Sequence, residues 1–86
     1  MKPFRAVLTD AADQAITDVE GSIEPDTGPA RKGRFEFADS DAVMQDILEG
    51  KTFGLQLEDG TQLAIRVSSA SAGPRAGYSV AEFSTT

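Results

Sequence analysis

The stretch 55–67, LQLEDGTQLAIRV, constrains the fold most, because an Asp-Gly pair between alternating apolar residues indicates a β-hairpin. A two-residue turn would set Leu55 opposite Ala64 and would put the apolar faces of the two strands on opposite sides of the sheet. A three-residue turn, Glu-Asp-Gly, sets Leu55 opposite Leu63 and keeps both apolar faces on one side. We therefore predict a type I turn with a left-handed Gly60 and a G1 bulge.

The same alternation predicts four further strands, at 4–9, 15–24, 34–37 and 78–84. In the second of these strands Ile16 is out of phase with Val19 and Ile23, which predicts a bulge near Thr17-Asp18. We expect loops between the elements, at 10–14, 25–33 and 69–77.

The last strand contains a conflict in its alternation. Val80 and Phe83 are three positions apart, so a regular strand cannot turn both toward the core. Either this strand has a bulge or one of the two side chains is exposed.

The only helix is predicted at 40–49, in the segment ADSDAVMQDILEGK. Asp39 or Ser40 can cap its start, and a carboxylate at Asp41 is favoured by the positive end of the helix dipole. Gly50 stands where a left-handed residue usually ends a helix. The spacing predicts an apolar stripe of Val43, Met44, Ile47 and Leu48.

The element order β-β-β-α-β-β-β indicates a mainly β fold, a small six-stranded barrel or sandwich, and 86 residues leave room for a single domain over 1–86. The two halves around the helix also resemble each other. At an offset of 49, Phe4, Leu8 and Ile16 match Phe53, Leu57 and Ile65, and GPARKG at 28–33 matches GPRAG at 73–77. This echo raises the hypothesis of a pseudo-two-fold between the halves.

The apolar positions of these elements form the predicted core. It comprises Phe4, Leu8, Ile16, Val19, Ile23, Phe35, Phe37, Val43, Ile47, Phe53, Leu55, Leu57, Leu63, Ile65, Val67, Val80 and Phe83.

The composition argues against several kinds of activity. The chain has no cysteine and no histidine, so it lacks thiolate chemistry, the commonest general base and the commonest transition-metal ligand. We expect no enzyme activity, no cofactor and no metal. Fourteen acidic against eight basic residues give a net charge of −6, so neither nucleic acid nor membrane is an expected partner.

The N-terminal stretch MKPFRAVLTD lacks the apolar core of a signal peptide. No stretch of the sequence approaches the length of a membrane span. The expected compartment is therefore the cytoplasm, or a particle assembled there.

One local anion-binding site is suggested by Arg31, Lys32 and Arg34, which lie beside glycines at 28 and 33. Arg75, on the matching loop, would share this site if the pseudo-two-fold brought the two loops together. The alternative is a solvated loop whose charge discourages aggregation. The six carboxylates between Asp10 and Asp26 lack the pattern of a calcium loop and instead suit a solvated strand face.

In element order the chain is similar to PilZ-type barrels, which bind a cyclic dinucleotide. That family binds through an Arg pair separated by three residues and a later Asp/Asn-x-Ser-x-x-Gly run. Here two residues separate Arg31 from Arg34, and no such run follows, so none of the family's site residues carries over.

The sequence therefore predicts a non-enzymatic protein-interaction module that contacts another protein or its own copies. The alternatives are a module that binds a small anion or nucleotide at the Arg31/Lys32/Arg34 loop, and a connector subunit of a phage-type particle.

Overall fold

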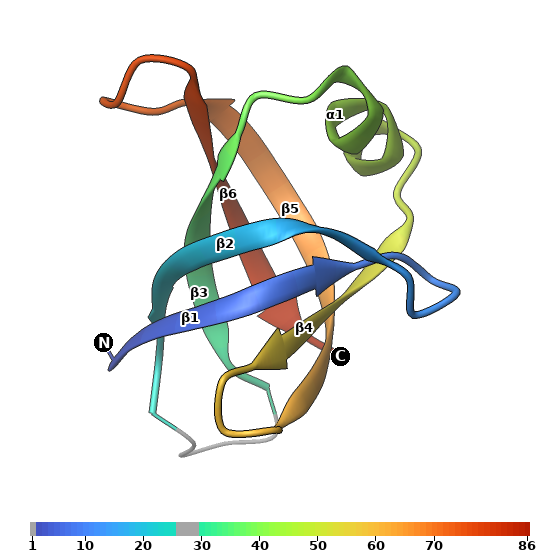
Figure 1. Cartoon of the computed structure of the whole chain (residues 1–86), viewed down its shortest axis with the longest axis vertical. Coiled ribbons are helices and arrows are strands. Elements are labelled where there is room, and N and C mark those ends of the chain that lie inside the picture. The colour runs from blue at the N-terminus through green and yellow to red at the C-terminus, as the bar shows by residue number, and fades with distance from the viewer. Residues whose placement is uncertain (1, 26–29) are drawn as a thin grey trace.

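The computed structural model describes residues 2–25 and 30–86 of the chain. Six antiparallel strands close into a barrel in the order β1-β2-β3-β6-β5-β4, and one helix lies over an end of the barrel (Figure 1). The elements are β1 (Lys2–Thr9), β2 (Ala15–Ile23), β3 (Lys32–Ala38), α1 (Asp41–Leu48), β4 (Thr52–Leu57), β5 (Gln62–Ala72) and β6 (Tyr78–Thr85). This arrangement confirms the predicted small β-barrel.

The β4–β5 hairpin has the predicted register. Leu55 pairs with Leu63 and Phe53 with Ile65, so the apolar faces of both strands turn toward the core. The turn closes with a bond from the Gly60 N–H to the Leu57 carbonyl at 3.0 Å, and Gly60 has φ 89. These features confirm the three-residue turn with a left-handed glycine.

The bulge in β2 lies earlier than predicted. Leu8 pairs with Thr17 and Thr9 with Ala15, so Ile16 is the extra residue and has no partner on β1. Because it sits in the bulge, Ile16 remains 36% exposed, and its prediction as a core residue was wrong.

The last strand is regular, and Val80 and Phe83 lie on its two faces, but neither is exposed as the second alternative expected. Phe83 is buried with Ala81 and Ser79, whereas Val80 is half-buried on the other side of the strand. The irregularity lies on the neighbouring strand, between Val67 and Ser69 of β5. That strand also continues to Ala72, so the expected loop at 69–77 is shorter than predicted.

Helix α1 begins after Ser40, whose hydroxyl accepts from the Val43 N–H at 3.4 Å. Val43 is buried, and Met44 and Ile47 pack against the core. Leu48, the remaining member of the predicted stripe, is 79% exposed. Gly50 has φ 73, as expected for a left-handed helix stop.

The core consists of the inward side chains of all six strands together with Val43 from the helix. Phe35 lies at its centre, with its ring centroid 5.7 Å from Phe37 and 5.8 Å from Phe83. Most predicted core residues are buried. Five of them, besides Val80, are only partly buried but pack against the core: Phe4, Ile47, Leu57, Leu63 and Val67.

The strand order is unchanged when the two halves of the chain are exchanged, as a pseudo-two-fold requires. However, not all of the matched residues occupy equivalent positions in the two halves of the structure. Thr9 pairs with Ala15 and Gly54 with Ala64, so the shared Ala-Ile dipeptides follow hairpin turns of different length and do not occupy equivalent places.

Candidate functional site: a groove on the outer face of the barrel

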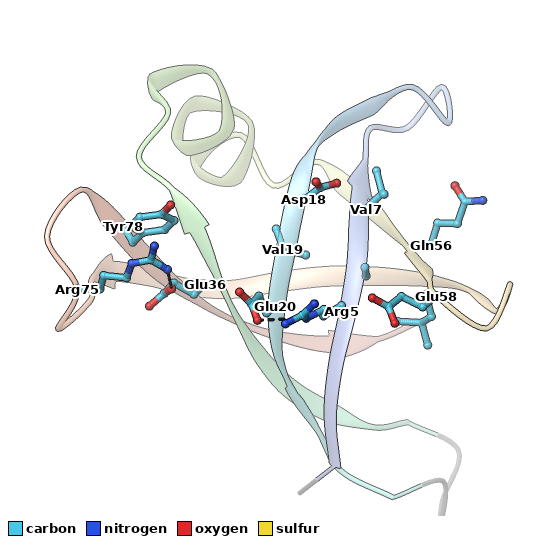
Figure 2. A pocket seen from close by; sticks show the side chains of 12 residues that line it. Arg5, Val7, Asp18, Val19, Glu20, Glu36, Gln56, Glu58, Arg75 and Tyr78 are labelled. Carbon is cyan, nitrogen blue, oxygen red and sulfur yellow. Dashed lines mark hydrogen bonds and ion pairs between the residues drawn. The ribbon is translucent and has the colours of Figure 1, made fainter.

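The outer face of β4, β1 and β2 carries a groove of about 700 Å³ that extends to Glu36 of β3 and to the β5–β6 loop. The alternation of each strand decides which residues line it. Because Ala6 and Leu8 turn inward to the core, Arg5 and Val7 turn outward into the groove. Figure 2 shows the side chains that line it.

Between β2 and β4 the groove has an apolar residue between two polar ones. Val7 pairs with Asp18 of β2 on one side and with Gln56 of β4 on the other. Val7 is half-buried, whereas Asp18 and Gln56 are exposed. The groove therefore offers a small apolar floor between polar walls.

A row of four charged side chains crosses one end of the groove. Arg5 pairs across the strands with Glu20, and Glu20 pairs in turn with Glu36. Arg5 Nε lies 3.5 Å from a Glu20 carboxylate oxygen, and a guanidinium nitrogen of Arg75 lies 3.3 Å from Glu36 Oε1. Each arginine thus offsets the charge of one glutamate, and the two glutamates face each other in the middle.

The β5–β6 loop supplies the far wall of the groove. Arg75 lies over the ring of Tyr78, 3.9 Å from its centroid, while it also pairs with Glu36. A cation on an aromatic face is held in place by the ring quadrupole. This double contact fixes Arg75 and Tyr78 opposite the β2 residues across the groove (Figure 2).

The groove runs along an edge of β2 where this strand is paired on one side only. Strand β2 pairs with β3 only over Glu20–Ile23, whereas it pairs with β1 from Ala15 to Ile23. In the described part of the chain, the first half of β2 therefore has no strand on its β3 side. Asp18 and Val19 of this half line the groove.

The groove is net acidic. Its four carboxylates, on Asp18, Glu20, Glu36 and Glu58, face two guanidinium groups, on Arg5 and Arg75. Asp18 and Glu58 form no ion pair with any residue in 2–25 or 30–86. Two negative charges are therefore available to a ligand.

The predicted anion site is not assembled as one unit. The backbone of Arg31 exchanges hydrogen bonds with Thr85, beside the first pair of the β3–β6 ladder. Arg75 lies beyond Tyr78, which forms the last pair of that ladder, with Ala38. Seven pairs separate the two ends by about 20 Å, so Arg31 and Arg75 cannot contact the same small anion. Gly28, expected to assist, lies outside the described residues.

The structure places Arg66 beside the predicted Arg31/Lys32/Arg34 cluster. Lys32 pairs with Ser84 of β6, and Ser84 pairs with Arg66 of β5, so both cations flank one serine on the outer face. We call Arg31, Lys32, Arg34 and Arg66 the basic surface. None of the four forms an ion pair with another described residue. Sequence reasoning missed Arg66 because only the β5–β6 register shows its neighbours.

The groups with clearly shifted pKa values lie away from the basic surface and the charged row. The Gln45 amide and the Lys51 ammonium both lower the pKa of Glu49, and Asp46 and Glu49 raise the pKa of Lys51.

Among the described residues no group of three or more carboxylates is placed to hold a metal ion. No helix in the described ranges is long and apolar enough to cross a membrane.

Comparisons with known proteins give no relative for this chain. No family model matches it, and neither a curated protein nor a solved structure is significantly similar to it.

Proposed function

We propose that this chain is a small protein-interaction module whose groove receives a basic, extended segment of a protein partner. The observation that carries the proposal is the groove itself, which combines an apolar floor at Val7 with a net negative lining. Asp18 and Glu58 supply carboxylates without an ion-pair partner in the described ranges. Complementary charge of this kind steers a basic partner and fixes its orientation.

An extended segment suits the groove because of the β2 edge. A strand whose backbone has a partner on one side only can accept another strand, and the added backbone bonds give affinity without a deep pocket. Alternate side chains of the added segment would then face the carboxylates of Asp18 and Glu20. A lysine or arginine at every second position matches that spacing.

The test is a titration of the isotope-labelled protein with an acetylated octapeptide that alternates arginine and valine. Binding is monitored by the chemical shifts of the protein's backbone amides. We expect the largest shifts at 15–20, Glu36 and Tyr78. A peptide with glutamate in place of arginine should cause none. Glu20→Lys should abolish the shifts, and Glu24→Lys, an equal charge change at an exposed residue outside the groove, should leave them.

Three outcomes would contradict the proposal. One is no shift with millimolar arginine peptide, and another is an equal response to the glutamate peptide. The third is equal loss of binding in Glu20→Lys and Glu24→Lys, which would mean that only the net charge of the chain attracts the peptide.

A further inference from the structure

The basic surface and the groove lie toward opposite ends of the β3–β6 ladder. Glu36 of β3 and Tyr78 of β6 line the groove, whereas Lys32 of β3 and Arg66, beside Ser84 of β6, lie toward the other end. From Glu36 and Tyr78 the groove extends across β2, β1 and β4. One copy therefore presents an acidic groove and a separate group of cations that form no ion pair with a described residue.

We propose that copies of this chain associate head to tail, with the basic surface of one copy seated in the groove of the next. This inference rests on the acidic lining that carries the proposed function of the groove, and it names a second copy as the partner. The contact is one between side chains, because Lys32, Arg34 and Arg66 lie on strands that already pair on both sides. The cations needed to neutralise Asp18 and Glu58 are present on the chain itself, on residues that have no ion-pair partner in the described ranges.

The local charges favour this contact although the whole chain is acidic. Four carboxylates against two guanidinium groups give the groove a charge of −2. Four cations against Glu82, opposite Arg34, and Glu24, opposite Lys32, give the basic surface a charge of +2. At physiological ionic strength charges more than about 8 Å apart are largely screened. The charges at the contact therefore attract each other, while the repulsion between the more distant charges of the two copies is reduced by screening.

The arrangement also predicts the shape of the assembly. A contact between two different surfaces leaves one of each free on every pair, so further copies can add. Because the groove residues Glu36 and Tyr78 and the basic surface lie toward opposite ends of the β3–β6 ladder, the two surfaces of one copy do not coincide, and a further copy can add to each. Short open chains are therefore expected rather than closed dimers.

The first experiment is sedimentation of the full chain over a range of concentrations. We expect the average mass to rise with protein concentration and to fall again when sodium chloride is added, since the contact is largely ionic. Arg66→Glu, on the basic surface, and Glu20→Lys, in the groove, should each sediment as single chains. Lys2→Glu and Asp41→Lys carry the same charge changes at exposed residues outside both surfaces and should associate as the unchanged chain does.

Mixing the two defective variants gives the sharpest test. The Glu20→Lys variant retains its basic surface and the Arg66→Glu variant retains its groove, so together they can form one contact and no more. We expect the mixture to give a pair of chains that does not grow further. Circular dichroism of each variant verifies the fold, and the salt dependence of the unchanged chain tests the contact without any substitution.

Three results would overturn the inference. The first is that the unchanged protein sediments with the mass of a single chain at every concentration. The second is that either defective variant continues to self-associate. The third is a mixture that remains single chains. If the arginine peptide still binds in the groove while the chain stays monomeric, the proposed function stands and only the second copy is excluded as partner.

Discussion

Glu20 and Glu36 lie directly opposite each other on β2 and β3, at the last pair of their ladder, although both are acidic. Like charges at such a position destabilise a sheet. Arg5 and Arg75 flank the pair from either side and offset part of the repulsion. The chain thus keeps two like charges side by side at the end of its groove, at a cost in stability that the proposed binding of a basic segment would explain.

The first prediction concerns this pair. A double-mutant cycle of Glu20→Gln and Glu36→Gln, measured by chemical denaturation, should give an unfavourable coupling of about 0.2–1 kcal/mol between the two glutamates. The coupling should shrink at about 1 M salt, because charges at a half-exposed site are screened. A favourable coupling, or one unaffected by salt, would mean that the two arginines already neutralise the pair.

The second prediction concerns the β4–β5 turn. Gly60 has φ 89, so a side chain there forces a conformation that most residues avoid. Gly60→Ala should lower the free energy of unfolding by roughly 1 kcal/mol. Gly60→Asn should cost less, because asparagine tolerates the left-handed region. Equal losses for the two variants would argue against backbone strain as the cause.

The third prediction concerns the close approach of β2 and β3. A Cβ built on Gly21 would meet the Arg34 carbonyl and lie 2.6 Å from the Phe35 Cα, so the strands would have to separate. Gly21→Ala should therefore destabilise the chain by about 1–3 kcal/mol, and the neighbouring Glu20→Ala should cost far less. An unchanged denaturation midpoint for Gly21→Ala would show that the strands adjust without loss.

These positions show why part of the fold could be predicted. The register of the β4–β5 hairpin follows from the sequence because slipping by one residue would expose every apolar side chain of one strand. Ile16 shows the limit of the same reasoning. A bulge at any of several neighbouring positions in β2 would bring the residues after it back into phase with the core. The sequence therefore does not determine which residue becomes the extra one.

The candidate site depended more on long-range pairing. Arg31, Lys32 and Arg34 were visible as neighbours in the sequence, but Arg66 joins them only through Ser84 of a third strand. Arg31 and Arg75 looked equivalent because their loops share a Gly-Pro-Arg pattern. Each loop directly precedes its strand, and β3 and β6 are antiparallel. The two loops therefore lie at opposite ends of the β3–β6 ladder. The groove likewise combines residues from β4, β1, β2 and β3, which no local pattern connects.

The fourth prediction concerns pH. The Thr61 N–H donates to Asp59 Oδ1 at 2.9 Å, and this bond lowers the pKa of Asp59 below its usual value of 3.8. A carboxylate with a lowered pKa in the folded chain contributes stability above its usual pKa, and that contribution is lost as the pH falls through the folded value. Asp59→Asn keeps the acceptor but cannot titrate. The difference in unfolding free energy between the unchanged chain and Asp59→Asn should shrink as the pH falls below about 4. A difference that is constant down to acid pH would contradict the role of the charge.

The last prediction separates the two ends of the β3–β6 ladder by their response to anions. Phosphate and citrate should shift the amide signals of Lys32, Arg34 and Arg66, because guanidinium and ammonium groups without ion-pair partners in the described ranges can donate to them. Arg66→Ala should weaken the response about tenfold, whereas Arg75→Ala should leave it unchanged, because Arg75 already pairs with Glu36 at the far end. If copies associate as proposed, the same anions should dissociate them at lower ionic strength than sodium chloride does, since they would bind the cations proposed to enter the groove. Equal effects of phosphate and chloride at matched ionic strength would show screening alone and no anion site. A loss of phosphate binding in Arg75→Ala would require the two loops to meet in solution, which the antiparallel pairing of β3 and β6 forbids.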